Sequence, residues 1–226
     1  MSIWISGSIP EVISATQTGL VNAIFADALT LRQWVRAGQS VSEALRAVGE
    51  VAPYALFVQL RGPRREDFLA EAETLRDISE LAQACVPPTA EGLAAAAELS
   101  AEGHQVMVWG VCSLEQAFLC AQAEVAALAI PFATYRATYS QPPQLLLQAC
   151  RTLFNHLGAG TFLMGADLQA EGDTGLALAH GADGLIVTYE QFGRLEQPTG
   201  LTDHYLQEAE QAYTEMGKGR PEAWWR

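Results

Sequence analysis

Short apolar runs alternate along this chain with longer segments of helical periodicity, a pattern typical of parallel strands joined by crossover helices. The alternation predicts eight strand–helix units in 226 residues, a length normal for one (β/α)8 barrel. A single-domain α/β protein folded as a closed TIM barrel is favoured, although alternation alone also fits a doubly wound open sheet. The expected strands are residues 3–5, 23–25, 54–60, 81–85, 105–109, 125–130, 161–164 and 184–187.

Several expected helices carry chemical signals at their ends. Ser40 with Glu43, and Ser113 with Gln116, fit the capping box, in which each side chain satisfies a free backbone N–H of the first turn. Gly103 and Gly181 suit the ends of helices, where glycine tolerates a left-handed conformation. Pro142 and Pro143 follow a loop and are placed to start a helix.

The C-terminal segment continues beyond the last expected strand. Residues 202–216 have the pattern of one more helix, followed by a tail that contains Lys218, Trp224 and Trp225. We therefore expect a barrel over residues 1–200 and an extra C-terminal helix and tail over residues 201–226. Two tryptophans at a terminus usually need something to cover them from water.

Composition restricts the partners. The chain carries 26 acidic and 13 basic residues, a formal charge of −13, so a nucleic-acid backbone or an anionic membrane surface would repel it. Its first residues lack a basic segment followed by an apolar one, and no later run has the roughly 20 apolar residues that a bilayer span needs. We expect a cytoplasmic protein that binds neither nucleic acid nor membrane.

The cysteines and histidines form no recognisable metal motif. Four cysteines are spread along the chain without C-x-x-C spacing, and four histidines form no H-x-x-x-H pair or Cys/His cluster. Reduced thiols are expected, because a chain of this size does not need disulfides to hold its core together. Neither a metal site nor a bound cofactor is predicted.

Residues 82–93, Ala-Gln-Ala-Cys-Val-Pro-Pro-Thr-Ala-Glu-Gly-Leu, resemble the strand-to-helix segment of the small transaldolase and fructose-6-phosphate aldolase family. Residues 17–24 look like the family's entry into its second strand, residues 56–60 like its third strand, and residues 180–184 like its approach to the eighth. The resemblance extends over about residues 3–195. It implies the closed barrel and, in active members, class I aldolase chemistry.

The resemblance places Cys85 where the family has the lysine that forms a Schiff base with its ketose substrate. The sequence contains a single lysine, Lys218, near the C-terminus. A thiol can add to a carbonyl, but the adduct does not stabilise a carbanion as a protonated Schiff base does. Cys85 is thus either a reactive thiol at the catalytic position or a small buried side chain that fills the space of the lysine. Lys218 could replace the lysine only if the tail folded over the barrel.

Other positions implied by the resemblance have also changed. The family's aspartate at the end of strand one falls on Ser6, and an asparagine after strand two falls on Asp27. Gln59 matches a glutamine that lines the family's pocket. The threonine that helps to hold the catalytic water falls on Trp109, a side chain large enough to fill a small pocket. The catalytic tyrosine falls on Phe132, which has no hydroxyl to relay a proton.

The phosphate-binding positions differ as well. The family's arginine falls on Tyr135, with Arg136 next to it. Its serine after strand seven falls on Ala166 or, with a shift of one residue, on Asp167. An aspartate at that place would repel a phosphate. A sugar phosphate or another small anionic metabolite is nevertheless the ligand class that the resemblance implies for the pocket formed by Ser6, Asp27, Gln59, Trp109, Phe132, Arg136 and Asp167.

Three functional hypotheses remain open from the sequence. The first is a pseudoenzyme without aldolase or transaldolase activity that has a binding, regulatory or assembly role. The second is an enzyme with residual or altered carbon–carbon lyase chemistry in carbohydrate metabolism that uses Asp27, Cys85 or Asp167 at the carboxyl ends of the strands. The third is a scaffold that forms a homo-oligomer. The resemblance implies it, because family members commonly assemble as rings in which the C-terminal helix packs on a neighbour, and it makes residues 205–216 and the tryptophans of the tail candidates for the subunit contact. The alternative is that this segment packs against its own barrel.

Overall fold

The computed structural model describes residues 2–197 and 200–215 of the chain. These residues divide after Tyr189 into two compact units. The first contains the strands, and the second is helical where it is described. The expected boundary after residue 200, between the barrel and a C-terminal helix with its tail, stays a prediction.

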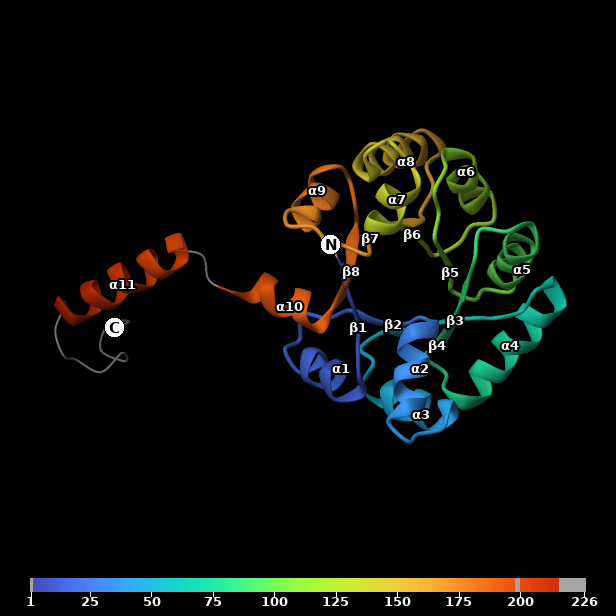
Figure 1. The fold of residues 1–226 in the computed structure, drawn as a ribbon, viewed down its shortest axis with the longest axis horizontal. Coiled ribbons are helices and arrows are strands. Elements are labelled where there is room, and N and C mark those ends of the chain that lie inside the picture. Colours follow the sequence, from blue (N-terminus) through green and yellow to red (C-terminus); the bar gives the residue numbers. More distant parts are fainter. Residues whose placement is uncertain (1, 198–199, 216–226) are drawn as a thin grey trace. The chain divides into compact units, whose positions relative to one another are not determined.

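In the described residues, eight parallel strands close into a barrel in the order in which they occur along the chain (Figure 1). Closure is made by β1 and β8, which pair from Ser2 with Gly184 to Ser6 with Thr188. This pairing excludes the doubly wound alternative and confirms the predicted TIM barrel. The strands are β1 (Ser2–Ser6), β2 (Ala23–Ala26), β3 (Ala55–Gln59), β4 (Ala82–Val86), β5 (Val106–Trp109), β6 (Ala127–Pro131), β7 (Phe162–Ala166) and β8 (Gly184–Thr188).

Helices surround the strands and connect each one to the next (Figure 1). Two helices separate β2 from β3, and two separate β6 from β7. The helices of the barrel are α1 (Ile9–Thr16), α2 (Ala28–Arg36), α3 (Val41–Val51), α4 (Arg65–Ile78), α5 (Ala90–Ala101), α6 (Leu114–Gln122), α7 (Phe132–Thr138), α8 (Pro143–Leu157) and α9 (Asp173–Ala179), and α10 (Tyr189–Glu196) follows β8.

The predicted helix ends are mostly confirmed. At α3, Ser40 Oγ accepts the Glu43 N–H at 3.2 Å and Glu43 Oε2 accepts the Ser40 N–H at 2.9 Å, which completes the capping box. At α6 only half of the predicted box forms: the Gln116 N–H reaches Ser113 Oγ, but Gln116 Oε1 accepts the N–H of Cys112 instead. The amide thus bonds to the residue before the N-cap and not to the N-cap itself.

The C-terminal unit contains the predicted extra helix, α11, which runs over Gly200–Glu215. Met216, Lys218 and the tail tryptophans of the predictions lie outside the described residues. Tyr205 and Leu206 are each 61% exposed on this helix. No helix in the described part of the chain is both long and apolar enough to cross a membrane.

The interior of the barrel is built from side chains two residues apart on the strands, as the period of a strand requires. They are almost entirely buried and form one cluster: Trp4, Ala23, Phe25, Ala55, Phe57, Cys85, Met107, Ala127, Ala129, Met164, Ala166 and Ile186, with Trp109 packed against it. Gly184 faces the same interior, where a Cβ would lie 2.3 Å from the Ser2 carbonyl oxygen. Strand β8 can therefore approach β1 only with glycine at this position.

Candidate functional site at the carboxyl end of the barrel

Three predicted site residues at the ends of β1, β2 and β3 are tied to the start of α2. Asp27 Oδ1 accepts the Thr30 N–H at 2.7 Å and so caps the helix. Ser6 Oγ lies 2.8 Å from Thr30 Oγ1, and Gln59 Oε1 accepts the Ala28 N–H at 3.0 Å. The structure thus brings Ser6, Asp27 and Gln59 together, but each already bonds to the protein through at least one oxygen.

Cys85 lies on β4 with none of its surface exposed. Burial raises the pKa of its thiol far above the ordinary value, and the negative charge of Asp27 raises it further, while a hydrogen bond from the Trp109 backbone opposes the shift. Because the thiolate is the nucleophilic form of cysteine, these surroundings make Cys85 unreactive at neutral pH.

An aromatic pair fills the carboxyl half of the barrel interior. Phe25 from β2 stacks on Trp109 from β5 with ring centroids 4.6 Å apart and planes inclined by 26°. Both rings belong to the packed interior that includes Cys85. The side chain predicted to occlude the pocket, Trp109, therefore lies inside the barrel with a partner ring across from it.

The start of α7 is occupied by the protein's own carboxylate. Asp167, just after β7, has a left-handed backbone with φ of 52°, uncommon for a residue with a side chain. Its Oδ2 accepts both the N–H and the hydroxyl of Thr134, at 2.8 and 2.7 Å, and its carbonyl accepts the Ala133 N–H. Phe132, the first residue of α7, is fully buried. Two amide donors of the first turn that could bind an anion, those of Ala133 and Thr134, already bind Asp167.

Arg136 forms a two-pronged ion pair. Its Nη1 and Nη2 donate to the two carboxylate oxygens of Asp173, at 2.7 and 2.6 Å, and join α7 to α9. The Asp173 side chain is only 1% exposed. Burial alone would raise the pKa of Asp173, but hydrogen bonds from Arg136 and from the Ala170 N–H outweigh it and hold that pKa below the ordinary value. Both Nη groups that would grip a phosphate are thus already engaged by a carboxylate.

Comparison with known proteins identifies the group to which this barrel belongs. Residues 15–188 match the family model described as transaldolase/fructose-6-phosphate aldolase, which covers most of the strands described above. The chain belongs to this family. A "Probable transaldolase" of Roseobacter denitrificans is 26% identical over 174 residues, which are 77% of this chain and 79% of that protein. A "Probable transaldolase" of Symbiobacterium thermophilum is 28% identical over 145 residues, 64% of this chain and 67% of that protein.

Solved structures of other proteins share the fold. A mandelate oxidase variant superposes with a TM-score of 0.59 at 13% identity, covering 84% of this chain and 66% of the oxidase. A flavocytochrome b2 variant with sulfite bound gives a TM-score of 0.60 at 13% identity, covering 85% of this chain and 57% of that protein. This chain spans less than two thirds of either structure, and at such low identity the likeness concerns the barrel alone.

Three residues at the carboxyl end of the barrel were not singled out from the sequence. Phe25, Thr30 and Asp173 are the partners of Trp109, Ser6 and Arg136. Thr30 had a local signal, since it stands three residues after a helix-capping aspartate. Nothing in the sequence connects Phe25 with Trp109, or Asp173 with Arg136, because each pair comes from elements distant along the chain.

No group of three histidine, cysteine or acidic side chains that could hold a metal ion occurs within residues 2–197 and 200–215. The two carboxylates named in the second functional hypothesis both bond to helix starts, Asp27 at α2 and Asp167 at α7. The polar side chains predicted at the site are thus all hydrogen-bonded within the protein: Ser6, Asp27, Gln59, Arg136 and Asp167.

Proposed function

We propose that this chain is a member of the transaldolase/fructose-6-phosphate aldolase family that has lost Schiff-base catalysis and has a binding, regulatory or assembly role in the cytoplasm. It forms no covalent intermediate with a ketose. The proposal joins the family relationship, shown by the match over residues 15–188, to the chemistry of the side chains at the carboxyl end.

The single observation that carries the proposal is the lysine content of the sequence. Only Lys218 supplies a side-chain amine, and it follows every strand of the barrel. A Schiff base needs a neutral amine in a desolvated pocket, so no strand of this barrel can provide one. Cys85, which the resemblance puts in the lysine's place, is a buried thiol with a raised pKa.

The surroundings of Cys85 give independent support. Trp109 and Phe25 fill the space beside it, and Phe132 has no hydroxyl for general acid–base catalysis. Arg136 is neutralised by Asp173, and Asp167 adds a negative charge at the start of α7. A single change could be a variation of mechanism, but these changes affect the nucleophile, the water site, the proton relay and the phosphate grip together.

The experiment is borohydride reduction of the full chain in the presence of fructose 6-phosphate, followed by peptide mass mapping and an assay for cleavage and transfer. We expect neither cleavage nor a trapped adduct on a side chain. The matched variants are Lys218→Ala, which removes the remaining lysine, and Cys85→Lys, which restores an amine on β4. Cys85→Lys should also stay inactive, because Phe25 and Trp109 occupy the interior next to it.

Two results would overturn the proposal. Cleavage that disappears in Lys218→Ala, with an adduct mapped to Lys218, would place the tail in an active site. Cleavage that survives in that variant but is lost in Cys85→Ser would show a repurposed thiol. Either outcome would support the second hypothesis, an enzyme with residual or altered activity on sugar phosphates. The name of both relatives, "Probable transaldolase", favours that hypothesis.

The binding part of the proposal concerns a small anionic metabolite. The transaldolase family acts on sugar phosphates, but the guanidinium that would hold a phosphate is paired here. Calorimetry with fructose 6-phosphate separates the roles: binding that weakens in Gln59→Ala would indicate a ligand-binding pseudoenzyme. No heat at millimolar ligand would leave assembly as the role.

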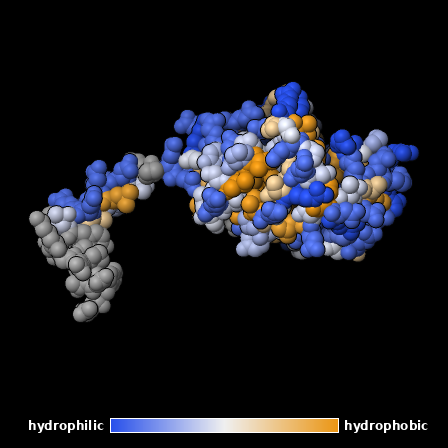
Figure 2. All heavy atoms as spheres, turned by 90° about the horizontal axis from the view of Figure 1, so that it is seen from below, coloured by the Kyte–Doolittle hydropathy of each residue, from blue (hydrophilic) through white to orange (hydrophobic). Residues whose placement is uncertain are grey.

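The assembly part is supported by apolar surface. Figure 2 views the barrel from the side of α1 to α4, and apolar side chains gather in the middle of that face. A groove of about 820 Å³ is lined by residues of α2, α3 and α4 and of the carboxyl end of β3, Gln59 among them. On α11, Tyr205 and Leu206 are exposed. We propose a homo-oligomer with α11 in the contact between subunits. Analytical sedimentation measures the mass in solution of the full chain and of Leu206→Ser, which should dissociate. A full chain that is monomeric at micromolar concentration would refute the proposal.

A further inference from the structure

The amino end of the barrel is hollow. The first inward-facing residues of β2, β3 and β6 are alanines, Ala23, Ala55 and Ala127, whereas TIM-barrel interiors are usually filled by large branched side chains. A cavity of about 360 Å³ opens at these residues. This volume lies within the range of about 300–1,000 Å³ that small-molecule sites occupy.

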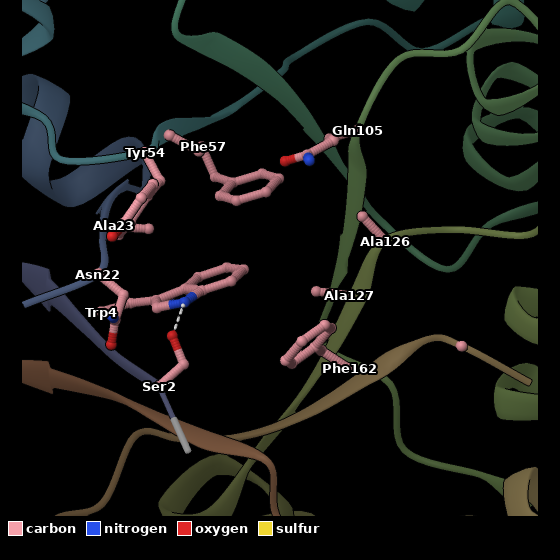
Figure 3. A pocket seen from close by; sticks show the side chains of 12 residues that line it. Ser2, Trp4, Asn22, Ala23, Tyr54, Phe57, Gln105, Ala126, Ala127 and Phe162 are labelled. Atoms are coloured by element: carbon pink, nitrogen blue, oxygen red, sulfur yellow. Dashed lines mark hydrogen bonds between the residues drawn. The ribbon is translucent and has the colours of Figure 1, made fainter.

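Two stacked rings face this cavity. Trp4 and Phe57 lie 4.5 Å apart between centroids with their planes inclined by only 5°, and both project into the space shown in Figure 3. The Trp4 indole N–H donates to Ser2 Oγ at 2.8 Å. Stacking and this hydrogen bond hold the indole in one orientation. Trp4 is 6% and Phe57 2% exposed, so the pair forms a fixed and mostly buried wall of the cavity.

The rim of the cavity exposes two more aromatic side chains. Phe162, at the start of β7, is 48% exposed and points toward the Trp4 ring in Figure 3. Tyr54, just before β3, is 74% exposed. A ligand that covers these aromatic side chains removes their apolar surface from water, which favours binding.

The polar groups of the cavity are uncharged. Gln105 extends its amide toward the centre of the cavity (Figure 3). Asn22 is fixed at the edge because its Oδ1 accepts the Ile3 N–H at 2.9 Å. Of the described residues that line the cavity, none carries a charge. Nothing there would compensate for the desolvation of an ionised ligand, so the lining favours a neutral one.

We propose that the amino end of the barrel binds a neutral, planar aromatic small molecule with one or two rings and a hydrogen-bonding substituent. The rings lie between Phe162 and the Trp4–Phe57 pair, and the substituent reaches the amide of Gln105. The site is at the opposite end of the barrel from the one where this fold usually binds its ligands, and it is independent of the proposed loss of Schiff-base chemistry.

Titration calorimetry of the full chain with 2-naphthol, which is neutral at pH 7, tests the site. We expect one molecule bound per chain with a Kd of about 100 µM, the strength that a ligand of this size commonly reaches. Ala127→Leu, which puts a larger side chain into the cavity, should weaken binding at least about tenfold. Phe162→Ser should have a similar effect by removing one aromatic wall.

The matched control is Phe118→Ser, the same substitution at a 41% exposed phenylalanine on α6, which should leave the affinity unchanged. Naphthalene-2-sulfonate, the same ring system with a negative charge, should bind at least about tenfold more weakly. Phe162→Ser keeps the test decisive if Ala127→Leu does not fold.

Several outcomes would overturn the proposal. They are no binding of 2-naphthol by the unaltered chain, binding that survives in both folded cavity variants, and sulfonate binding as tight as that of 2-naphthol. A drop in molecular mass in solution caused by Phe162→Ser would show that this end is covered by a second copy of the chain, and would equally refute a small-molecule site.

Discussion

The carboxyl and amino ends of this barrel are built from the same strands, yet their interiors are filled differently. At the carboxyl end, Phe25 and Trp109 stack inside the barrel, and Cys85 is fully buried among the interior side chains. At the amino end, Ala23, Ala55 and Ala127 leave a cavity that faces the Trp4–Phe57 pair. Backbone geometry is common to both ends, so side-chain volume at inward positions decides which end of a barrel is open.

The two ends of the barrel also differ in how far their polar groups are available to a ligand. Those at the carboxyl end are bonded within the protein, as Asp27 is to α2, Asp167 to α7 and Arg136 to Asp173. At the amino end, the lining side chains carry no charge, and Gln105 extends into the cavity. The charged groups at the carboxyl end hold helices in place, because they are bonded within the protein and are not available to a ligand.

The largest effect is expected from opening the carboxyl end. Phe25→Ala should cost about 3–5 kcal/mol of stability, because the ring is buried and stacked on Trp109. It should also expose Cys85, which a thiol-reactive disulfide reagent would detect as a much faster modification in a Cys112→Ser background. Urea unfolding measures the stability. Phe68→Ala on α4 is the control, since it removes an equally buried ring outside the barrel interior. Equal reactivity of Cys85 before and after Phe25→Ala would contradict a closed end.

Removing the ion pair at the carboxyl end should have the next largest effect. Asp173→Asn leaves Arg136 without its partner and should cost about 2 kcal/mol at pH 7, less than a fully buried pair because Arg136 is 34% exposed. The pKa of Asp173 is depressed in the folded protein, so its contribution is present above the ordinary aspartate pKa of about 3.9 and is lost as pH falls through the lower folded value.

Chemical unfolding at a series of pH values checks this prediction. The difference in unfolding free energy between the parent chain and Asp173→Asn should shrink below about pH 4. Glu190→Gln, which breaks the exposed Arg194–Glu190 pair within α10, should cost less than about 0.5 kcal/mol. A difference that stayed constant down to pH 2 would mean that the effect does not come from the charge of Asp173.

A matched pair of substitutions on β6 compares the two ends directly. Ala129 lies beside Trp109 in the strand register, and Ala127 lines the cavity at the amino end. Ala129→Leu should cost about 1–3 kcal/mol through overpacking, whereas Ala127→Leu has room and should change stability by less than about 1 kcal/mol. Thermal or urea unfolding of both variants measures the contrast. Equal costs would show that the two ends are packed alike.

The smallest effect concerns the role of Asp27. Asp27→Ala should cost about 1 kcal/mol because it removes the cap of α2, and Asp27→Asn should preserve most of the stability because asparagine caps well. Urea unfolding distinguishes the two variants. If both were as stable as the parent chain, or more stable, Asp27 would be held at this end for a purpose other than capping.

Much of the fold could be predicted because its signals are local. The strands lie within a few residues of the predicted runs, and Ser40 with Glu43 caps α3 as expected. Gly103 and Gly181, predicted at helix ends, have φ of 87° and 99°. Gln116 was expected to complete a capping box and instead bonds to Cys112, a choice between neighbouring N–H groups that the sequence pattern does not determine.

The candidate site was less accessible to sequence reasoning. The resemblance to the family indicated which positions to inspect, and the structure places these residues at one end of the barrel. It could not indicate that Arg136 is paired with Asp173, since the two stand 37 residues apart on different helices. The cavity at the amino end was not anticipated, because single alanines on separate strands carry no signal until the register sets them side by side.

The sequence by itself determined the alternation of strands and helices, the family and the absence of any lysine from the strands, since these depend only on local pattern and on residue identity. The tertiary structure alone decided which end of the barrel is filled, which charges neutralise one another and where a cavity remains. The physical reason is that closure of the barrel sets inward side chains from distant strands against each other, and their packing depends on strand register and volume together.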